Sequence, residues 1–241
     1  MTPSSPKARS AFAAALEPLA RATVDPVEAT DLILSLLLIH RGLRDTLAWE
    51  TIRHVVSQAA SSPGDATATQ ALDLRAHAEL TSELRVLQTA MDWPTTAPLT
   101  DLEPAEDFPI HLLAPVLDSF PGPGRSWHRT LGDTTVDVLL RGEATLLSWG
   151  SRSSPTSRLL SHAAAGSVHH RSVVYDPACG TGEILWTLAG KAAAPRLLGN
   201  DLDPSILRIA HLRAALRGIT LTSTTQDIAV SYTHLTLPTK A

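Results

Sequence analysis

A buried strand that leads directly into a glycine loop restricts the fold of this chain more than any other feature. Residues 171–176, Arg-Ser-Val-Val-Tyr-Asp, have the apolar run of a strand in a parallel sheet. The loop Pro-Ala-Cys-Gly-Thr-Gly follows at residues 177–182, and residues 183–194 have the pattern of a helix. Gly180 and Gly182 allow the backbone to approach a bound molecule and to turn sharply into that helix. The segment therefore predicts a ligand-binding strand, loop and helix.

Two more strands extend this unit into half of a doubly wound sheet. Residues 196–201 predict a second strand, residues 204–217 a helix closed by Gly218, and residues 219–225 a third strand. Strands that alternate with helices in this way are typical of α/β folds with a parallel sheet. Ligands of such folds bind at the carboxyl ends of the strands. We therefore expect an α/β fold with its site around the loop at residues 177–182.

The loop also restricts the class of ligand. A dinucleotide fingerprint needs a third glycine where this chain has Leu185, and the Gly-Lys-Ser/Thr of a phosphate-binding loop is absent. A ligand with an amino-acid moiety and no phosphate fits the loop better. Asp201 ends the second strand, 25 residues after Asp176, where a carboxylate accepts both hydroxyls of a ribose. Asp203 precedes Pro204 and is predicted to cap the following helix, which favours Asp201 for the ribose.

These segments resemble the motifs of a known enzyme family. Asp-Pro-Ala-Cys-Gly-Thr-Gly-Glu-Ile-Leu at residues 176–185 resembles motif I of the N6-adenine-specific DNA methyltransferases, the family that includes the type I restriction-modification M subunits. Leu-Gly-Asn-Asp-Leu-Asp-Pro at residues 198–204 is similar to their motif II, and Gln-Asp-Ile at residues 226–228 stands where motif III is expected. Ser-Pro-Thr-Ser-Arg-Leu-Leu at residues 154–160 is similar to the Thr-Pro segment, motif X, that precedes the fold.

The resemblance implies S-adenosylmethionine as the cofactor and the first half of a truncated class I, Rossmann-like methyltransferase fold. The implied cofactor contacts are Asp176, Pro177, Ala178, Gly180 and Gly182 in the loop, Asp201 and Asp227 after the next two strands, and Ser154 and Pro155 upstream. Of these, Asp176, Gly180 and Gly182 would hold the methionine part and Asp201 the ribose. Asp227 would meet the adenine amino group, and the Ser-Pro pair would pack against the methionine end.

The residues alone leave simpler roles open for several of these positions. Asp176 could cap the loop, Asp227 could be a turn residue at a strand end, and the Ser-Pro pair at residues 154–155 could lie in an ordinary loop. Cys179 is predicted to pack in the loop rather than to act as a nucleophile. Two positions depart from the family pattern: Glu183 stands where the family often has glycine, and a serine replaces the usual threonine before the proline of motif X.

The function that the resemblance implies is methyl transfer to adenine N6 of DNA in a restriction-modification or phage-defence system. Such enzymes hold the flipped base with an Asn/Asp/Ser-Pro-Pro-Tyr/Phe motif, and no two prolines are adjacent in this chain. We expect that motif to lie beyond Ala229, so that the fragment has no catalytic residue and DNA is bound through missing C-terminal regions or a specificity subunit. Two alternatives are a class I methyltransferase acting on protein or a small molecule, and a non-catalytic cofactor-binding or scaffold subunit.

The last residues resemble no part of the chain before them. Val-Ser-Tyr-Thr-His-Leu-Thr-Leu-Pro-Thr at residues 230–239 matches one reading frame of the transposon end and adapter used to prepare sequencing libraries. We therefore expect residues 230–241 to be a translated adapter and exclude them from the fold. The expected methyltransferase segment then spans residues 151–229.

The sequence before residue 151 predicts a mostly helical domain over residues 25–150, after a disordered or weakly ordered start at residues 1–24. Asp25-Pro26-Val27-Glu28 has the order of a capping box with proline in the first turn, and Gly42 is the expected stop of that helix. Further helices are expected at residues 45–60, 66–91 and 107–120. Residues 135–140 and 144–149 are apolar and fit either a strand or a helix.

Charge and composition exclude several classes of protein. Residues 1–150 hold 11 basic and 19 acidic residues, for a net charge of −8, whereas residues 151–241 have a net charge of +4. The total of −4 excludes a wholly basic nucleic-acid clamp. The single cysteine excludes a disulfide framework, and the histidines of the first half lack metal-ligand spacing. No apolar run is long enough to span a membrane, so we expect a soluble, cytoplasmic protein. Arg208, Arg213 and Arg217 are predicted to form the solvated face of a helix.

Overall fold

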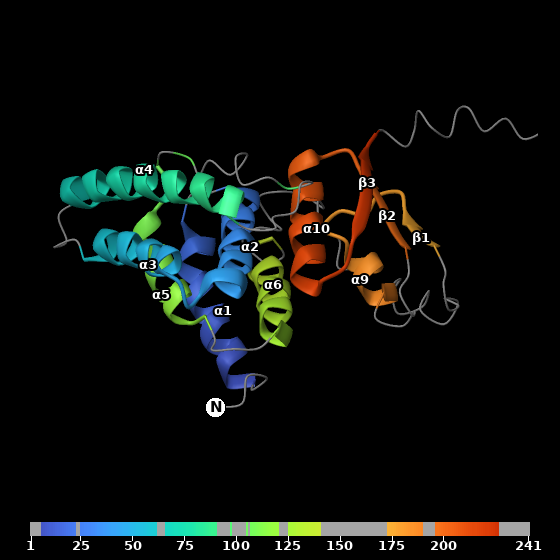
Figure 1. Ribbon diagram of the computed structural model, residues 1–241, viewed down its shortest axis with the longest axis horizontal. Coiled ribbons are helices and arrows are strands. Elements are labelled where there is room, and N and C mark those ends of the chain that lie inside the picture. Colours follow the sequence, from blue (N-terminus) through green and yellow to red (C-terminus); the bar gives the residue numbers. More distant parts are fainter. Residues whose placement is uncertain are drawn as a thin grey trace, which may run out of the picture.

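The computed structural model in Figure 1 describes residues 6–22, 25–61, 66–90, 97, 105, 107–120, 125–140, 173–189 and 196–226. Within these residues, one part of the molecule is helical and the other is a small sheet with its own helices. A single helix, α10 (Pro204–Arg217), lies between the two parts. None of the helices described is both long enough and apolar enough to cross a membrane.

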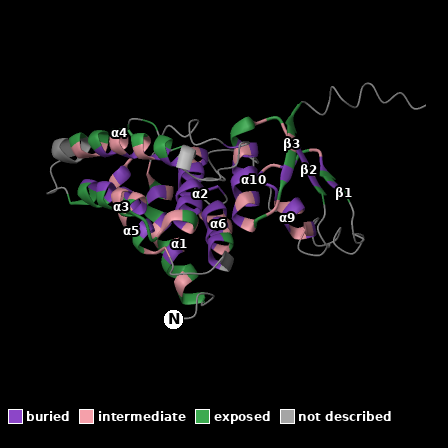
Figure 2. Ribbon diagram, viewed as in Figure 1, coloured by how far each residue is buried: buried purple, intermediate pink, exposed green. Residues whose placement is uncertain are grey.

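The helical part is organised around one buried helix. Its elements are α1 (Pro6–Arg21), α2 (Pro26–Leu43), α3 (Leu47–Ala60), α4 (Ala66–Ala90), a 3-10 turn η2 (Ile110–Leu113), α5 (Ala114–Asp118) and α6 (Arg125–Leu139). Every residue of α2 from Ala29 to His40 is buried, and the helix contacts α3, α6 and α10 (Figure 2). The apolar run at residues 29–40 is therefore the centre of a helical core.

The start of α2 confirms one prediction and corrects two others. Asp25 caps the helix, because its side chain accepts a hydrogen bond from the Val27 amide at 2.7 Å. Glu28 does not close a capping box, since its carboxylate accepts from the amide of Ala105. Gly42 does not stop the helix either. It lies within α2 and has no positive φ, so the helix continues for one more residue.

The expectation of disorder before residue 25 is wrong for residues 6–21. These residues form α1, which begins at Pro6 and packs against α5 and α6. Phe12, Leu16 and Leu19 are buried in the helical core. The Ser/Pro-rich first residues suggested disorder, but the apolar residues of the next turns have helical spacing and find partners in segments distant in the sequence.

The structure describes one of the two apolar segments, residues 135–140 and 144–149, that fit either a strand or a helix by sequence. Residues 135–139 are helical and form the end of α6, whereas residues 144–149 lie outside the described part of the chain. Val136 and Leu139 are buried in the helical core. The segment at residues 107–120 is a 3-10 turn followed by the short helix α5, with Pro115 in its first turn.

The three strands pair in parallel, as the sequence predicts. They are β1 (Val173–Asp176), β2 (Arg196–Asp201) and β3 (Leu221–Thr225), and they form one sheet in the order β1-β2-β3. In the register, Asp176 stands opposite Gly199, and Asp201 stands opposite Thr225. Helix α9 (Glu183–Ala189) contacts β1 and β2, while α10 contacts β2 and β3. The carboxyl ends of the three strands therefore share one edge of the sheet.

Helix α10 belongs to two hydrophobic cores at once. Leu207, Ala210 and Ala214 pack in the core between the sheet and its helices. Ile206, Ile209, Leu212 and Leu216 pack instead in the core of the helical part. A Cβ added to Gly132 of α6 would lie 2.8 Å from Leu216 Cδ1, so the glycine permits close packing of α6 on α10. Because one helix is covered on both sides, the sheet and the helical part pack together.

The prediction that Arg208, Arg213 and Arg217 form a solvated face is wrong. Arg213 is 1% exposed, and the side chains of Arg208 and Arg217 are only 10% and 7% exposed. Each forms an ion pair with a carboxylate of the helical part: Asp31 of α2 for Arg208, and Asp133 of α6 for the other two. The local sequence of α10 does not show that a second layer of helices covers this face.

Candidate functional site

The loop after β1 turns on two glycines with left-handed backbone. Gly180 has φ 53° and Gly182 has φ 83°, a region that favours glycine. A Cβ on Gly182 would lie 2.4 Å from the Trp186 ring, so this position tolerates no side chain. A Cβ on Gly180 would meet no atom within 4 Å. The loop is therefore packed against α9 at one glycine and open at the other.

Asp176 ends β1 with one satisfied carboxylate oxygen and one that is not. Oδ1 accepts a hydrogen bond from the Ala178 amide at 3.1 Å, which is the loop cap considered from the sequence. Oδ2 is buried and has no hydrogen-bond partner among the described residues. Desolvation by burial raises the pKa of this carboxyl, and the nearby charge of Asp201 raises it further. The site thus holds a buried acceptor that lacks a donor.

Asp201 connects the end of β2 to the glycine loop. Its Oδ2 accepts from the Gly180 amide at 2.8 Å, and its Oδ1 accepts from the Asp203 amide at 3.0 Å. Each carboxylate oxygen has a second lone pair, so Asp201 can still accept from two hydroxyl donors. Asp203 has the role predicted for it: its side chain caps α10 by accepting from the amides of Ser205 and Ile206.

Asn200 is a site residue that the sequence analysis did not single out. It is 2% exposed, and its amide nitrogen donates to the carbonyls of Pro177 at 3.1 Å and Gln226 at 2.8 Å. Its Oδ1 accepts from the Thr224 hydroxyl and from the Gln226 amide. One side chain therefore joins the start of the glycine loop to the end of β3. A polar residue just before the acidic end of a buried strand is the sequence signal that could have identified it.

Cys179 packs in the loop as predicted. Its amide donates to the Asn200 carbonyl at 2.8 Å, and a Cβ on Gly199 would lie 2.9 Å from its sulfur. Burial raises the pKa of the thiol to about 12, with further increases from Asp176 and Asp201. Because the thiolate is the nucleophilic form, this cysteine is not an activated nucleophile at neutral pH.

The predicted site residues fall into two groups. Asp176, Pro177, Ala178, Gly180, Gly182 and Asp201 lie together at the carboxyl ends of β1 and β2. Ser154, Pro155 and Asp227 lie outside the described residues, so their roles stay predictions. Within the described ranges, no group of three or more His, Cys, Asp or Glu side chains could hold a metal ion.

The arrangement suits one kind of ligand in particular. Two carboxylates at adjacent strand ends repel phosphate and attract cations. Asp176 has an unsatisfied acceptor for an ammonium group, and Asp201 has free lone pairs for a pair of hydroxyls. S-adenosylmethionine carries an ammonium, a sulfonium and two ribose hydroxyls but no phosphate. The residues present therefore fit this cofactor.

Comparison with known proteins finds a relative among the methyltransferases. No family model matches the chain. The chain is 32% identical over 95 residues to a protein of Dechloromonas aromatica (strain RCB) named Ribosomal protein L11 methyltransferase. That match covers 39% of this chain and 31% of the relative, so the chain spans about a third of the length of the protein that it matches. The chain is thus a distant relative of a methyltransferase. This match does not support membership of the adenine-specific DNA methyltransferases, whose motifs the sequence resembles.

Proposed function

We propose that this chain is part of a class I S-adenosylmethionine-dependent methyltransferase and that it binds the cofactor at the loop of residues 177–182. The observation that carries the proposal is the buried Oδ2 of Asp176, which has no hydrogen-bond partner among the described residues. Buried polar atoms in proteins are nearly always paired, so an unpaired carboxylate oxygen beside a glycine loop indicates a donor on a bound ligand. The parallel sheet and the methyltransferase relative support the same conclusion.

Each residue of the loop has a defined part in this proposal. Asp176 accepts from the ammonium of the methionine moiety, and Asp201 accepts from the ribose hydroxyls. Gly180 leaves room for the ligand, because nothing lies within 4 Å of the position of its missing Cβ. Asn200 fixes the position of the loop relative to the end of β3 through four hydrogen bonds. When bound, the cofactor supplies an electrophilic methyl group on a sulfonium.

Replacing Asp176 tests the proposal against a matched control. We expect Asp176→Asn to weaken S-adenosylmethionine binding about 10- to 100-fold, the effect of losing one hydrogen bond between charged groups. Asp203→Asn removes the same charge two residues beyond Asp201 but keeps a good helix cap, so its dissociation constant should stay within about twofold. Calorimetric titration of both variants measures the difference. Equal affinity for the two variants would exclude Asp176 as the cofactor's acceptor.

For the methyl acceptor, we propose adenine N6 of DNA in a restriction-modification or phage-defence system. Support comes from Asp-Pro-Ala-Cys-Gly-Thr-Gly at residues 176–182 and Asp-Leu-Asp-Pro at residues 201–204, which resemble motifs I and II of that family. In this proposal the partners are DNA and further subunits of the system. These would supply the base pocket, since the chain has no Pro-Pro pair.

A protein acceptor is the second candidate, because the relative found by comparison is named for a ribosomal protein. Incubation of the chain with a labelled methyl donor, unmethylated DNA and a cell protein extract separates the two. The adenine proposal predicts no label in either fraction from this chain alone and an Asn/Asp-Pro-Pro-Tyr/Phe sequence downstream in the source gene. Label in the protein fraction favours the second candidate. Label in DNA would contradict the need for that motif.

A further inference from the structure

A buried guanidinium lies between the glycine loop and the helical part. Arg213 of α10 is the largest fully buried side chain of the described residues. Its Nη1 donates to the carbonyl oxygen of Thr181 at 2.7 Å and to the Thr181 hydroxyl at 3.1 Å. Its Nη2 donates to Asp133 of α6 at 2.7 Å and to Glu183 at 3.2 Å. One side chain therefore connects the loop, the start of α9 and the helical part.

Two further contacts strengthen this connection. Arg217, one turn along α10, also pairs with Asp133, and its guanidinium lies 5.2 Å from the centroid of the Trp186 ring. The Trp186 indole donates to the same Thr181 carbonyl at 3.0 Å. Burial opposes ionisation of Asp133, but the two guanidiniums outweigh that effect and hold its pKa below the ordinary value. Asp133 is therefore an anion that anchors both arginines.

We propose that Asp133 and Arg213 are positioning residues for the cofactor loop: the carboxylate on α6 orients the guanidinium, and the guanidinium holds Thr181. The inference rests on the proposed function. Thr181 lies between Gly180 and Gly182, so its carbonyl and hydroxyl set the path of the most permissive part of the loop. An arginine fork fixes direction as well as distance, which a lysine ammonium does not.

Stability alone is a weaker explanation of this network. Burying a guanidinium carries a large desolvation penalty, so a buried ion pair is poor support for a purely stabilising role. The chain also has a second ion pair between α10 and the helical part, formed by Arg208 with Asp31 of α2. The pair of Arg213 with Asp133 is the one whose arginine donates two hydrogen bonds to Thr181 of the loop.

The two ion pairs provide a variant and its matched control. Asp133→Asn and Asp31→Asn each remove one carboxylate charge facing α10, and both should lower the melting temperature. We expect only Asp133→Asn to weaken S-adenosylmethionine binding, by about two- to thirtyfold, the range of coupling between residues in one network. Asp133→Glu, which keeps the charge, should recover part of the affinity. If the Asp133→Asn and Asp31→Asn variants bind with equal affinity, the positioning role is wrong.

A second measurement separates this inference from the proposed function. Hydrogen exchange of the amides at residues 178–183 reports on the loop without any cofactor. We expect faster exchange there in Asp133→Asn than in Asp31→Asn, and unchanged exchange in the loop would overturn the inference. Failure of the unmodified chain to bind S-adenosylmethionine would instead overturn the proposed function.

Discussion

Gly182 shows at a single residue how packing and backbone conformation act together. Its φ of 83° disfavours any side chain, and a Cβ would lie 2.4 Å from the ring of Trp186. Gly180 has the same kind of backbone, with φ 53°, but open space around it. Substitutions at the two glycines can therefore distinguish the cost of a steric clash from the cost of backbone strain.

We expect Gly182→Ala to destabilise the protein by about 3 kcal/mol, the sum of left-handed strain and an overpacked contact. Gly180→Ala should cost about 1 kcal/mol, since only the strain applies. Urea denaturation of the two variants measures the difference in free energy of unfolding. Equal losses would show that the Trp186 contact relaxes without cost.

Asp176 illustrates why a residue that we propose binds the cofactor need not stabilise the fold. Its folded pKa is raised, so the stability that this group contributes is present below its unfolded pKa and is lost as pH rises through the folded one. Above its folded pKa, the ionised carboxylate therefore lowers the stability of the unliganded fold. The Asp176→Asn variant that should lose the cofactor should unfold at the same temperature as the parent protein or higher.

At the scale of elements, α2 and α6 are joined through a pair of buried histidines. His40 Nδ1 and His128 Nε2 are 3.0 Å apart, and the His40 ring also makes edge contacts with Trp49 and Phe120. Desolvation, followed by the charge of His128 when protonated, lowers the pKa of His40 from 6.5 to about 4. The folded protein therefore keeps His40 neutral where the unfolded chain would protonate it.

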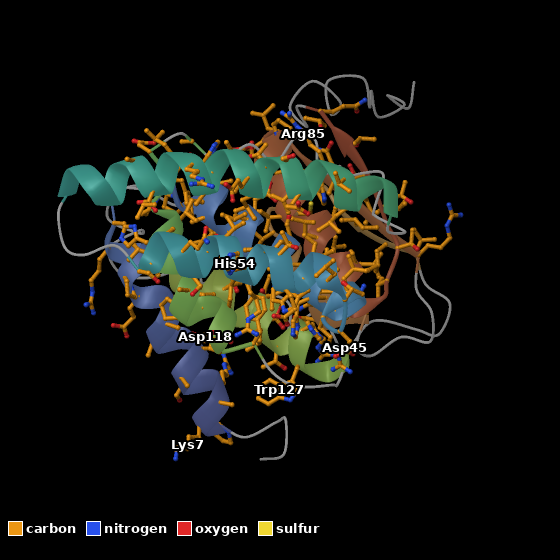
Figure 3. The ribbon with its side chains drawn as sticks, turned by 60° about the vertical axis from the view of Figure 1, so that its left-hand side comes forward. Lys7, Asp45, His54, Arg85, Asp118 and Trp127 are labelled. Carbon is orange, nitrogen blue, oxygen red and sulfur yellow. The ribbon has the colours of Figure 1, made fainter. Side chains whose placement is uncertain are left out.

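This contact predicts a loss of stability in mild acid. A lowered histidine pKa contributes stability that is present above pH 6.5 and is lost as pH falls towards 4, about 3 kcal/mol in all. His40→Gln should make the free energy of unfolding less dependent on pH in that range. His54 is exposed on α3 (Figure 3), so His54→Gln is the control and should keep the parent's pH profile. A parent profile that is flat between pH 6.5 and 4 would contradict the role of His40.

The elements also show what local sequence can and cannot predict. Asp203 and Gly218 carry their own signals, a cap before proline and a left-handed glycine, and the structure places both ends of α10 there. The burial of Arg213 has no local signal, because it depends on α6 packing from a distant part of the chain. Likewise, Phe12 is buried only because α5 and α6 lie against α1.

The same division holds within the site. Asp176 and Asp201 were predictable, because the ends of parallel strands and the glycine loop locate them. Asn200 could have been noticed as a polar residue before the acidic end of a strand, but its role could not be predicted. Its four hydrogen bonds join segments that meet only when β2 lies between the loop and the end of β3.

At the scale of the whole molecule, the cofactor loop and the helical part are connected through one helix. Side chains of α10 pack in the core beside the sheet and in the core of the helical part, and Arg213 of the same helix donates to Thr181. The helical part is therefore part of the cofactor site in our proposal, rather than a separate module. Residues 1–150, which include the helical part, have a net charge of −8, and such a charge does not favour contact with DNA phosphates.

Titration of the whole chain with three candidate ligands tests whether the loop at residues 177–182 binds S-adenosylmethionine. S-adenosylmethionine, S-adenosylhomocysteine and ATP share an adenosine, but only the first two carry the methionine-type ammonium, and only ATP carries phosphates. We expect binding of the first two compounds and none of ATP, because Asp176 needs an ammonium donor and both carboxylates repel phosphate. Binding of ATP in preference, or binding of none of the three, would contradict the proposal.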